Sequence, residues 1–262
     1  MSTEHHKSDP VVRRISVTDV AEALSDGMRD FQAAPLYGLI IGIMFAAGGI
    51  LIVFSITALG MSYLGYPLAA GFALLGPFAA IGLYDISRRR ETGQPISLLH
   101  IWSTIKSRSE IAWMAFVTLF VFIFWMYQVR LLMALFLGLS SSALNFNQFI
   151  VQVLTTNEGI LFLLVGNAIG AVLSLILFSL TVISFPLLLE REVDFVTAMI
   201  TSIRAVVASP TPMIGWAAVV VVLLILSMLP LFLGLLVVLP VLGHSTWHLY
   251  RRVIEPLSQR SQ

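Results

Sequence analysis

Two histidines four residues apart form the arrangement in this sequence that comes closest to a metal site. His244 and His248 would lie on one face of a helix, and imidazole nitrogens at that spacing can bind zinc. The metalloprotease pattern needs glutamate directly after the first histidine, but Ser245 occupies that position. A third ligand, His100, would require a second helix to pack nearby. We therefore expect the two histidines, with Trp247 beside them, to anchor a helix end and to bind no metal.

Three further polar residues stand out because apolar sequence surrounds them. Asn167 lies inside a long apolar stretch, where we expect its amide to hydrogen-bond another helix, with a substrate contact as the alternative. Arg130 and Glu158 flank an irregular segment, and we considered an ion pair between them that closes it, or a role in ligand binding. An exposed pair of this kind contributes about 0–1 kcal/mol.

Asp85, Glu190 and Arg191 follow two apolar stretches directly. Charges in such positions usually reach toward water or stabilise a helix end, which is the role that we expect for them. The alternative is a polar mouth that they form together or with neighbouring surface helices.

The composition makes lipid the solvent for much of this chain. Of 262 residues, 58% are hydrophobic and 11% are charged, and the mean hydropathy is +0.94, whereas soluble domains carry about 25% charged residues. The net charge of +1 gives no case for a nucleic-acid partner. The absence of cysteine excludes disulfides, iron–sulfur clusters and thiol catalysis. No phosphate-binding loop or nucleophile elbow is present, so we expect no catalytic residues, no cofactor and no enzyme activity.

The apolar stretches predict an all-α, polytopic membrane protein with six transmembrane helices. About 20 apolar residues cross a bilayer as a helix. The predicted spans are Leu36–Leu59, Pro67–Ile86, Ile111–Val129, Gly159–Leu189, Met213–Leu229 and the stretch from Pro230 to Gly243. Gly38–Gly42 and Gly166–Gly170 repeat the small-xxx-small pattern, which is typical of close helix packing in membranes.

Amphipathic segments precede three pairs of spans, which suggests a three-fold repeat of helix plus hairpin. They are Ser16–Ala34, Ile96–Ser109 and Asp194–Ser209. In the first, Ser16 is a candidate N-cap with Asp19 in the first turn. Its polar face is acidic, so we expect the helix to pack on the protein itself and not on anionic lipid.

These elements divide the chain into three units between two polar tails. The tails are 1–15 and 255–262, and the units are 16–93, 94–193 and 194–254. Within the second unit, 131–157 is predicted to be an outer loop. For its irregular part, 131–154, an interfacial helix and a re-entrant segment remain as alternatives.

The positive charges predict the orientation of the spans. The chain has 15 Lys and Arg residues, and the predicted topology puts all but Arg130 on one side of the membrane. Among acidic residues, only Glu158 lies opposite. Because loops rich in Lys and Arg stay in the cytoplasm, we expect both termini to be cytoplasmic and the number of spans to be even.

Four groups of residues carry a family resemblance. They are Pro35, Gly76-Pro77 with Tyr84-Asp85, Phe185-Pro186 with Glu190-Arg191, and Pro240 with Tyr250-Arg251. Together they resemble an uncharacterised, alphaproteobacterial family of predicted integral membrane proteins, whose members are sometimes labelled cytochrome c oxidase subunit I. The resemblance covers nearly the whole chain and implies a location in the bacterial inner membrane, but it transfers no catalytic residues. A haem–copper subunit needs several histidines within its spans, and the predicted spans contain none, so we reject the oxidase label as chemistry.

Two functions are consistent with these features, and in both the protein is embedded in the lipid bilayer. The first is a non-enzymatic membrane protein that packs with, or helps to assemble, another membrane complex. The second is a passive or weakly coupled transporter of a small uncharged or apolar molecule, using kinks at Pro77, Pro186 and Pro240. A lipid-modifying enzyme is disfavoured because its motifs are missing. The oligomeric state is left open.

Overall fold

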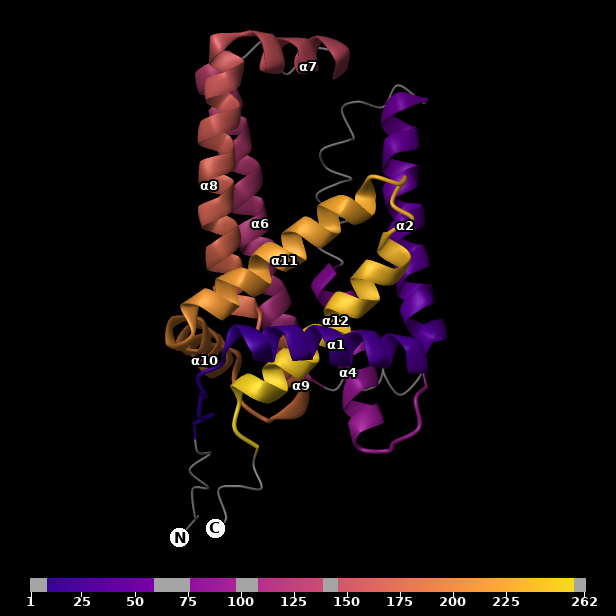
Figure 1. The fold of residues 1–262 in the computed structure, drawn as a ribbon. Helices are drawn as coiled ribbons and strands as arrows, with labels where there is room; N and C mark the ends of the chain where they lie inside the picture. Colours follow the sequence, from indigo (N-terminus) through magenta and orange to yellow (C-terminus); the bar gives the residue numbers. More distant parts are fainter. Residues whose placement is uncertain (1–8, 59–75, 98–107, 139–145, 257–262) are drawn as a thin grey trace. The chain divides into compact units, whose positions relative to one another are not determined.

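The structure, a computed structural model, describes residues 9–58, 76–97, 108–138 and 146–256 (Figure 1). Within these ranges the regular secondary structure is helical, apart from one isolated antiparallel bridge between Val12 and Ile254. The all-α fold class is therefore confirmed.

Four helical stretches among the described residues are long and apolar enough to cross a membrane. They are α2 (Pro35–Thr57), α6 (Ser109–Phe136), the stretch Asn157–Glu190, and α11 (Pro210–Met228). They correspond to the first, third, fourth and fifth predicted spans. The first half of the second predicted span lies outside the described residues. Its second half belongs to α4 (Gly76–Glu91). The sixth corresponds to α12 (Leu235–Val253), in which polar residues follow the apolar ones. The count of six and the three-fold repeat stay predictions.

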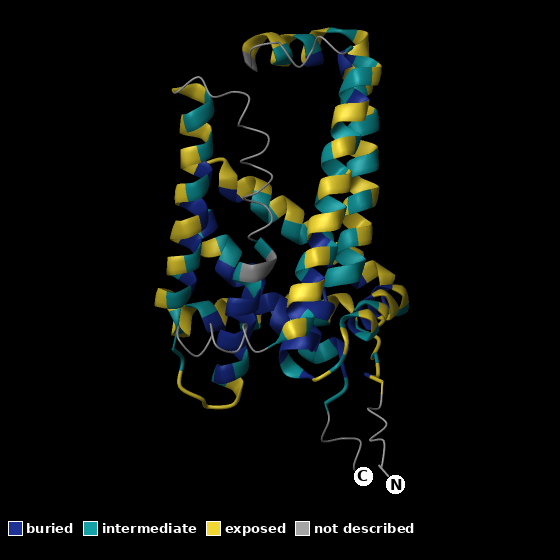
Figure 2. Cartoon of the chain, turned by 180° about the vertical axis from the view of Figure 1, so that it is seen from behind, coloured by how far each residue is buried: buried dark blue, intermediate teal, exposed yellow. Residues whose placement is uncertain are grey.

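The chain divides into two compact units, each with its own packing. The first comprises 1–50, 75–114 and 179–262, and the second comprises 51–74 and 115–178. In the first unit, α12 contacts α1 (Val17–Ala33), α4, α9 (Ser184–Glu190) and α11. Figure 2 shows buried residues concentrated around these contacts, and α12 is buried continuously from Pro240 to Trp247.

Helix α1 forms as the sequence predicts and packs on α12. The Ser16 hydroxyl accepts from the Asp19 N–H (3.2 Å), and the Asp19 carboxylate accepts from the Ser16 N–H (2.7 Å), which completes a capping box. Its buried face consists of Ala23, Gly27 and Asp30. At Gly27 the two helices are so close that a Cβ atom would lie 2.1 Å from Ser245 Oγ and 2.5 Å from Ser245 N. The expectation that this helix packs on the protein is confirmed.

The small-residue pattern of α2 also serves close packing. A Cβ added at Gly38 would lie 2.9 Å from Pro240 Cβ, and one added at Gly42 would lie 2.6 Å from Leu236 Cα. Both neighbours belong to α12, so the predicted packing role of Gly38–Gly42 is confirmed.

The fourth predicted span is interrupted near its end. Helix α8 (Asn157–Thr181) stops, and α9 begins at Ser184, two residues before Pro186. Because proline has no N–H, it cannot bond the carbonyl four residues earlier. Within the break, the Ile183 N–H donates to Ser202 Oγ (3.2 Å) on α10 (Phe195–Ala208). The third amphipathic segment thus forms as predicted, with Asp194 as its N-cap.

In the second unit, α6 and α8 lie side by side (Figure 1). A Cβ at Gly170 would lie 2.8 Å from the Trp125 indole, so the second small-residue pattern also serves packing. The predicted outer loop 131–157 is largely helical where it is described, because α6 continues to Phe136 and α7 spans Phe146–Thr155. The second amphipathic segment, Ile96–Ser109, lies mostly outside the described residues.

Replacing Gly27 with alanine should destabilise the first unit. The new methyl group would collide with Ser245 backbone atoms that cannot move independently, and overpacking typically costs about 1–3 kcal/mol. Thermal unfolding in detergent should show a lower Tm. Gly215→Ala in α11 is the control, because no atom lies within 4 Å of the added Cβ, and its Tm should match or exceed the wild type. Equal Tm values for both variants would contradict the close approach.

Candidate functional site

Three helices of the first unit bring polar side chains into one network, which is buried around Asp30, Ser87 and His244. The carboxylate of Asp30 on α1 accepts from Ser87 Oγ on α4 (2.6 Å) and contacts His248 Nε2 on α12 (2.8 Å). Its other oxygen lies 3.1 Å from Arg90 Nη1. We call Asp30, Ser87, Glu91, His244 and His248 the Asp30 network. A buried carboxylate is stable only when partners of this kind compensate its charge.

The hydrogen bonds of Ser87 define the proton positions. Its hydroxyl has one hydrogen, which goes to Asp30, so His244 Nδ1 must donate to Ser87 Oγ across 2.8 Å. A nucleophilic serine would instead donate to its histidine. The other ring nitrogen, His244 Nε2, is buried without a hydrogen-bond partner. Burial lowers the pKa of His244 to about 4, although the Asp30 carboxylate acts in the opposite direction, so the ring is neutral at pH 7.

Glu91 connects the network to the end of α12. Its carboxylate accepts from Trp247 Nε1 (3.0 Å) and lies 3.6 Å from His248 Nδ1 and 3.3 Å from Arg251 Nε. Burial raises the pKa of Glu91 despite these donors. Burial also acts to raise the pKa of Asp30, but the hydrogen bonds from His248 and Ser87 outweigh it, and that pKa lies below its ordinary value.

A second set of contacts connects α9 to α12. Glu190 accepts from the Tyr250 hydroxyl and from Arg251 Nη1 (2.5 Å), so Arg251 bridges Glu190 and Glu91. Burial, followed by the neighbouring Glu190 carboxylate, raises the pKa of Tyr250. Arg191 donates to the Glu255 carbonyl, and its Nε lies 3.7 Å from Glu190 Oε2.

Asp85 is fully buried and pairs with arginines of its own helix. Its two oxygens lie 2.5 Å from Arg88 Nη2 and 2.7 Å from Arg89 Nε. Arg88 also donates to the Leu189 carbonyl of α9 (3.1 Å). Removing one partner of such a buried pair is costly, because the other charge is left uncompensated. The carboxylate thus helps to position α4 against α9.

The structure places the predicted site residues in two groups. Asp85, Glu190, Arg191, His244 and His248 lie in the first unit, in or beside the polar contacts described above. Asp85 does not join Glu190 and Arg191 in one cluster. The histidines, expected to anchor a helix end, are instead packed against α4 and α1, because Ser87 and Asp30 offer them partners.

Asn167, Arg130 and Glu158 belong to the second unit. Asn167 Nδ2 donates to the Leu163 carbonyl of its own helix (2.7 Å), where we expected a bond to another helix. Arg130 and Glu158 are exposed, and within the described part of the chain no ion pair joins them.

Sequence reasoning missed Asp30, Ser87 and Glu91. We counted Asp30 with the other acidic residues on the polar face of its helix and gave it no role of its own. A usable signal was present, because Asp30 follows Ala23 and Gly27 at helical spacing, and two small residues in that register mark a face that packs closely. Among the described residues, no group of three or more His, Asp or Glu side chains could hold a metal.

The burial of His244 predicts that its contribution to the stability of the fold is lost as the pH is lowered. Its pKa is lower in the folded state than the ordinary 6.5, so the unfolded chain binds more protons between about pH 6.5 and 4, and stability is lost as the pH falls through this window. The lowered pKa of Asp30 acts in the same direction at lower pH, whereas the raised pKa of Glu91 acts in the opposite direction. The contribution of His244 should therefore lower Tm in detergent from pH 7 to 5. His244→Gln should show a shallower fall, and an unchanged slope would contradict the assignment.

Comparison with known proteins finds one similar family and no activity. Residues 65–190 match a family model described as "Predicted integral membrane protein (DUF2189)". No curated protein and no solved structure matches the chain. The matched part contains Ser87, Glu91 and Glu190, whereas Asp30 and both network histidines lie outside it. Residues 65–190, slightly less than half of the chain, are thus similar to an uncharacterised family of predicted integral membrane proteins, as the motifs indicated.

Proposed function

We propose that this integral membrane protein is a non-enzymatic accessory component, which packs with or helps to assemble another complex of the bacterial inner membrane. The observation that carries the proposal is the outward-facing amide of Asn167 in the middle of α8. The Asp30 network supports the non-enzymatic part, because its groups bond to one another and connect helices.

Asn167 lies near the midpoint of α8 and is exposed. One amide hydrogen is bonded to Leu163, while no bond of its carbonyl oxygen is found among the described residues. An unpaired polar group facing hydrocarbon is unfavourable, and a hydrogen bond to a neighbouring membrane helix contributes about 0.6–2 kcal/mol. Asn167 therefore favours a partner helix over lipid.

Small residues beside Asn167 would allow such a helix to approach. Ala168 and Ala171 are also exposed, and Ala171 lies one turn further along the helix. Close approach is what lets a short amide reach across to a partner. In the stretch from Asn157 to Glu190, none of the 18 consecutive residues that are most apolar is buried inside the protein. This surface is therefore available to a partner helix.

The contacts of the two chain ends support the proposed orientation. The Arg13 N–H donates to the Val253 carbonyl (2.7 Å), and the Glu255 N–H donates to the Val11 carbonyl (3.1 Å). The N-terminal and C-terminal segments therefore lie side by side where they leave the first unit. An even number of membrane crossings requires both ends on the same side, which agrees with this contact. With the arginine-rich side in the cytoplasm, both termini are cytoplasmic in the proposed multi-pass arrangement.

Replacing Asn167 with leucine should weaken the complex. We expect gentle detergent extraction and native mass spectrometry to find a different membrane protein bound to the wild type, and at least several-fold less of it bound to Asn167→Leu. Asn157→Leu, the same change at the first residue of α8, should retain the partner because that position lies at the helix end. A wild-type protein recovered alone, or only with copies of itself, would contradict the accessory role.

A further inference from the structure

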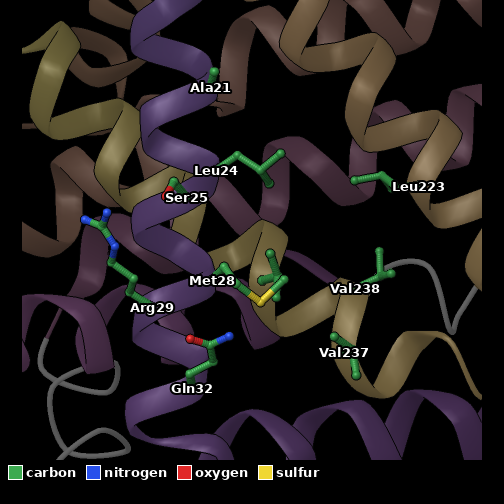
Figure 3. Close-up of a pocket in the computed structure, with 10 residues that line it drawn as sticks. Ala21, Leu24, Ser25, Met28, Arg29, Gln32, Leu223, Val237 and Val238 are labelled. Carbon is green, nitrogen blue, oxygen red and sulfur yellow. The ribbon is translucent and has the colours of Figure 1, made fainter.

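A cavity of about 620 Å³ lies between α1, α11 and α12. Its volume falls within the range of about 300–1,000 Å³ that is typical of ligand sites. Figure 3 shows Leu24, Met28 and Gln32 extending from α1 toward Val237 and Val238 of α12. All three helices belong to the first unit.

The lining divides into an apolar wall and a polar rim. The wall consists of Leu24 and Met28 on α1, Leu223 on α11, and three valines on α12, namely Val237, Val238 and Val241. The rim is formed by Ser25, Arg29 and Gln32, all on α1 and all exposed. Arg29 extends to the side of α1 away from Val237 and Val238 (Figure 3). A ligand that satisfies both parts must be amphiphilic.

In the proposed multi-pass arrangement, the two parts lie where the membrane meets water. Helix α1 is amphipathic and ends at Ala33, and α2, which is apolar enough to span, begins at Pro35. The rim residues therefore lie at the membrane boundary, while the spanning helix α11 carries its wall residue into the apolar layer. A bilayer lipid has its polar and apolar parts in this same order.

Arg29 is the one charged residue of the rim and favours an anionic head group there, whereas the acidic residues Asp19, Glu22 and Asp26 of the same helix lie outside the lining. Arg29 Nη1 pairs with Asp26 (3.0 Å), but that carboxylate is shared with Arg252 (2.7 Å), which also lies 3.5 Å from Glu22. The Arg29 side chain is 74% exposed, and its Nε and Nη2 make no hydrogen bond within the described part of the chain. These donors match the geometry of a phosphate.

We propose that this cavity binds one bilayer phospholipid. One acyl chain lies against Leu223, Val238 and Val241, and the phosphate lies over α1 beside Ser25, Gln32 and Arg29. The proposal goes beyond the accessory role, because a lipid in this position would belong to the protein whether or not a partner is bound.

The test uses the full chain in phosphatidylglycerol vesicles that contain a small share of phosphatidylglycerol with a photoreactive acyl chain. Crosslinked peptides should come from 21–32 and from 237–241 at least tenfold more often than from the exposed apolar face of α11 around Val221 and Val222. Unlabelled phosphatidylglycerol should compete in the wild type. Crosslinking no higher than on that face, or crosslinking that unlabelled lipid does not compete, would overturn the proposal.

Variants test the two parts separately. Val238→Trp should fill the cavity and reduce crosslinking at least tenfold, whereas Val221→Trp, exposed on α11 and outside the lining, should leave it unchanged. Arg29→Gln should reduce the preference for phosphatidylglycerol over phosphatidylcholine several-fold, whereas Arg14→Gln on the exposed N-terminal arm should not. A Tm within a few degrees of the wild type confirms that each variant is folded. Retained crosslinking in folded Val238→Trp would contradict the site.

Discussion

A buried carboxylate is stable only when hydrogen-bond donors or positive charges compensate it, and the donors to Asp30 come from two other helices. It lies on the face of α1 that packs on α12, so it cannot turn to water without separating the two helices. Ser87 and Arg90 come from α4 and His248 from α12, at separations of 57, 60 and 218 residues along the chain. The position of α1, the end of α4 and the register of α12 are therefore coupled through one side chain.

The rest of the first unit extends this pattern. Glu91, Arg251 and Glu190 carry the connections from α4 to α12 and on to α9, and Gly27 allows α1 and α12 to approach closely enough for the bonds to form. Exposed ion pairs contribute little to stability, but those of the buried Asp30 and Asp85 carboxylates impose geometry because a missing partner is costly. We therefore interpret the polar end of this unit as a framework, from which apolar helices extend into the membrane.

The sequence alone predicted the local features of the fold well. The Ser16 cap and Pro35 bounded the first helix to within about one residue, and hydropathy found the spans that the structure contains. What it missed depends on contacts between distant residues. Asp30 looked like one of several acidic residues on a polar face, because its partners lie on helices that the sequence pattern cannot place beside it. At Pro186 the sequence suggested a kink, but it did not show that the helix stops before it or that Ser202 of α10 accepts a bond from Ile183.

The coupling between Asp30 and His248 is the most direct test of this account. Free energies of unfolding in detergent should be measured for Asp30→Asn, His248→Gln and the double variant. If the two side chains connect α1 to α12 as described, the cycle should give a coupling free energy of about 1–3 kcal/mol. Effects that add to within about 0.5 kcal/mol would contradict the central role of the buried carboxylate.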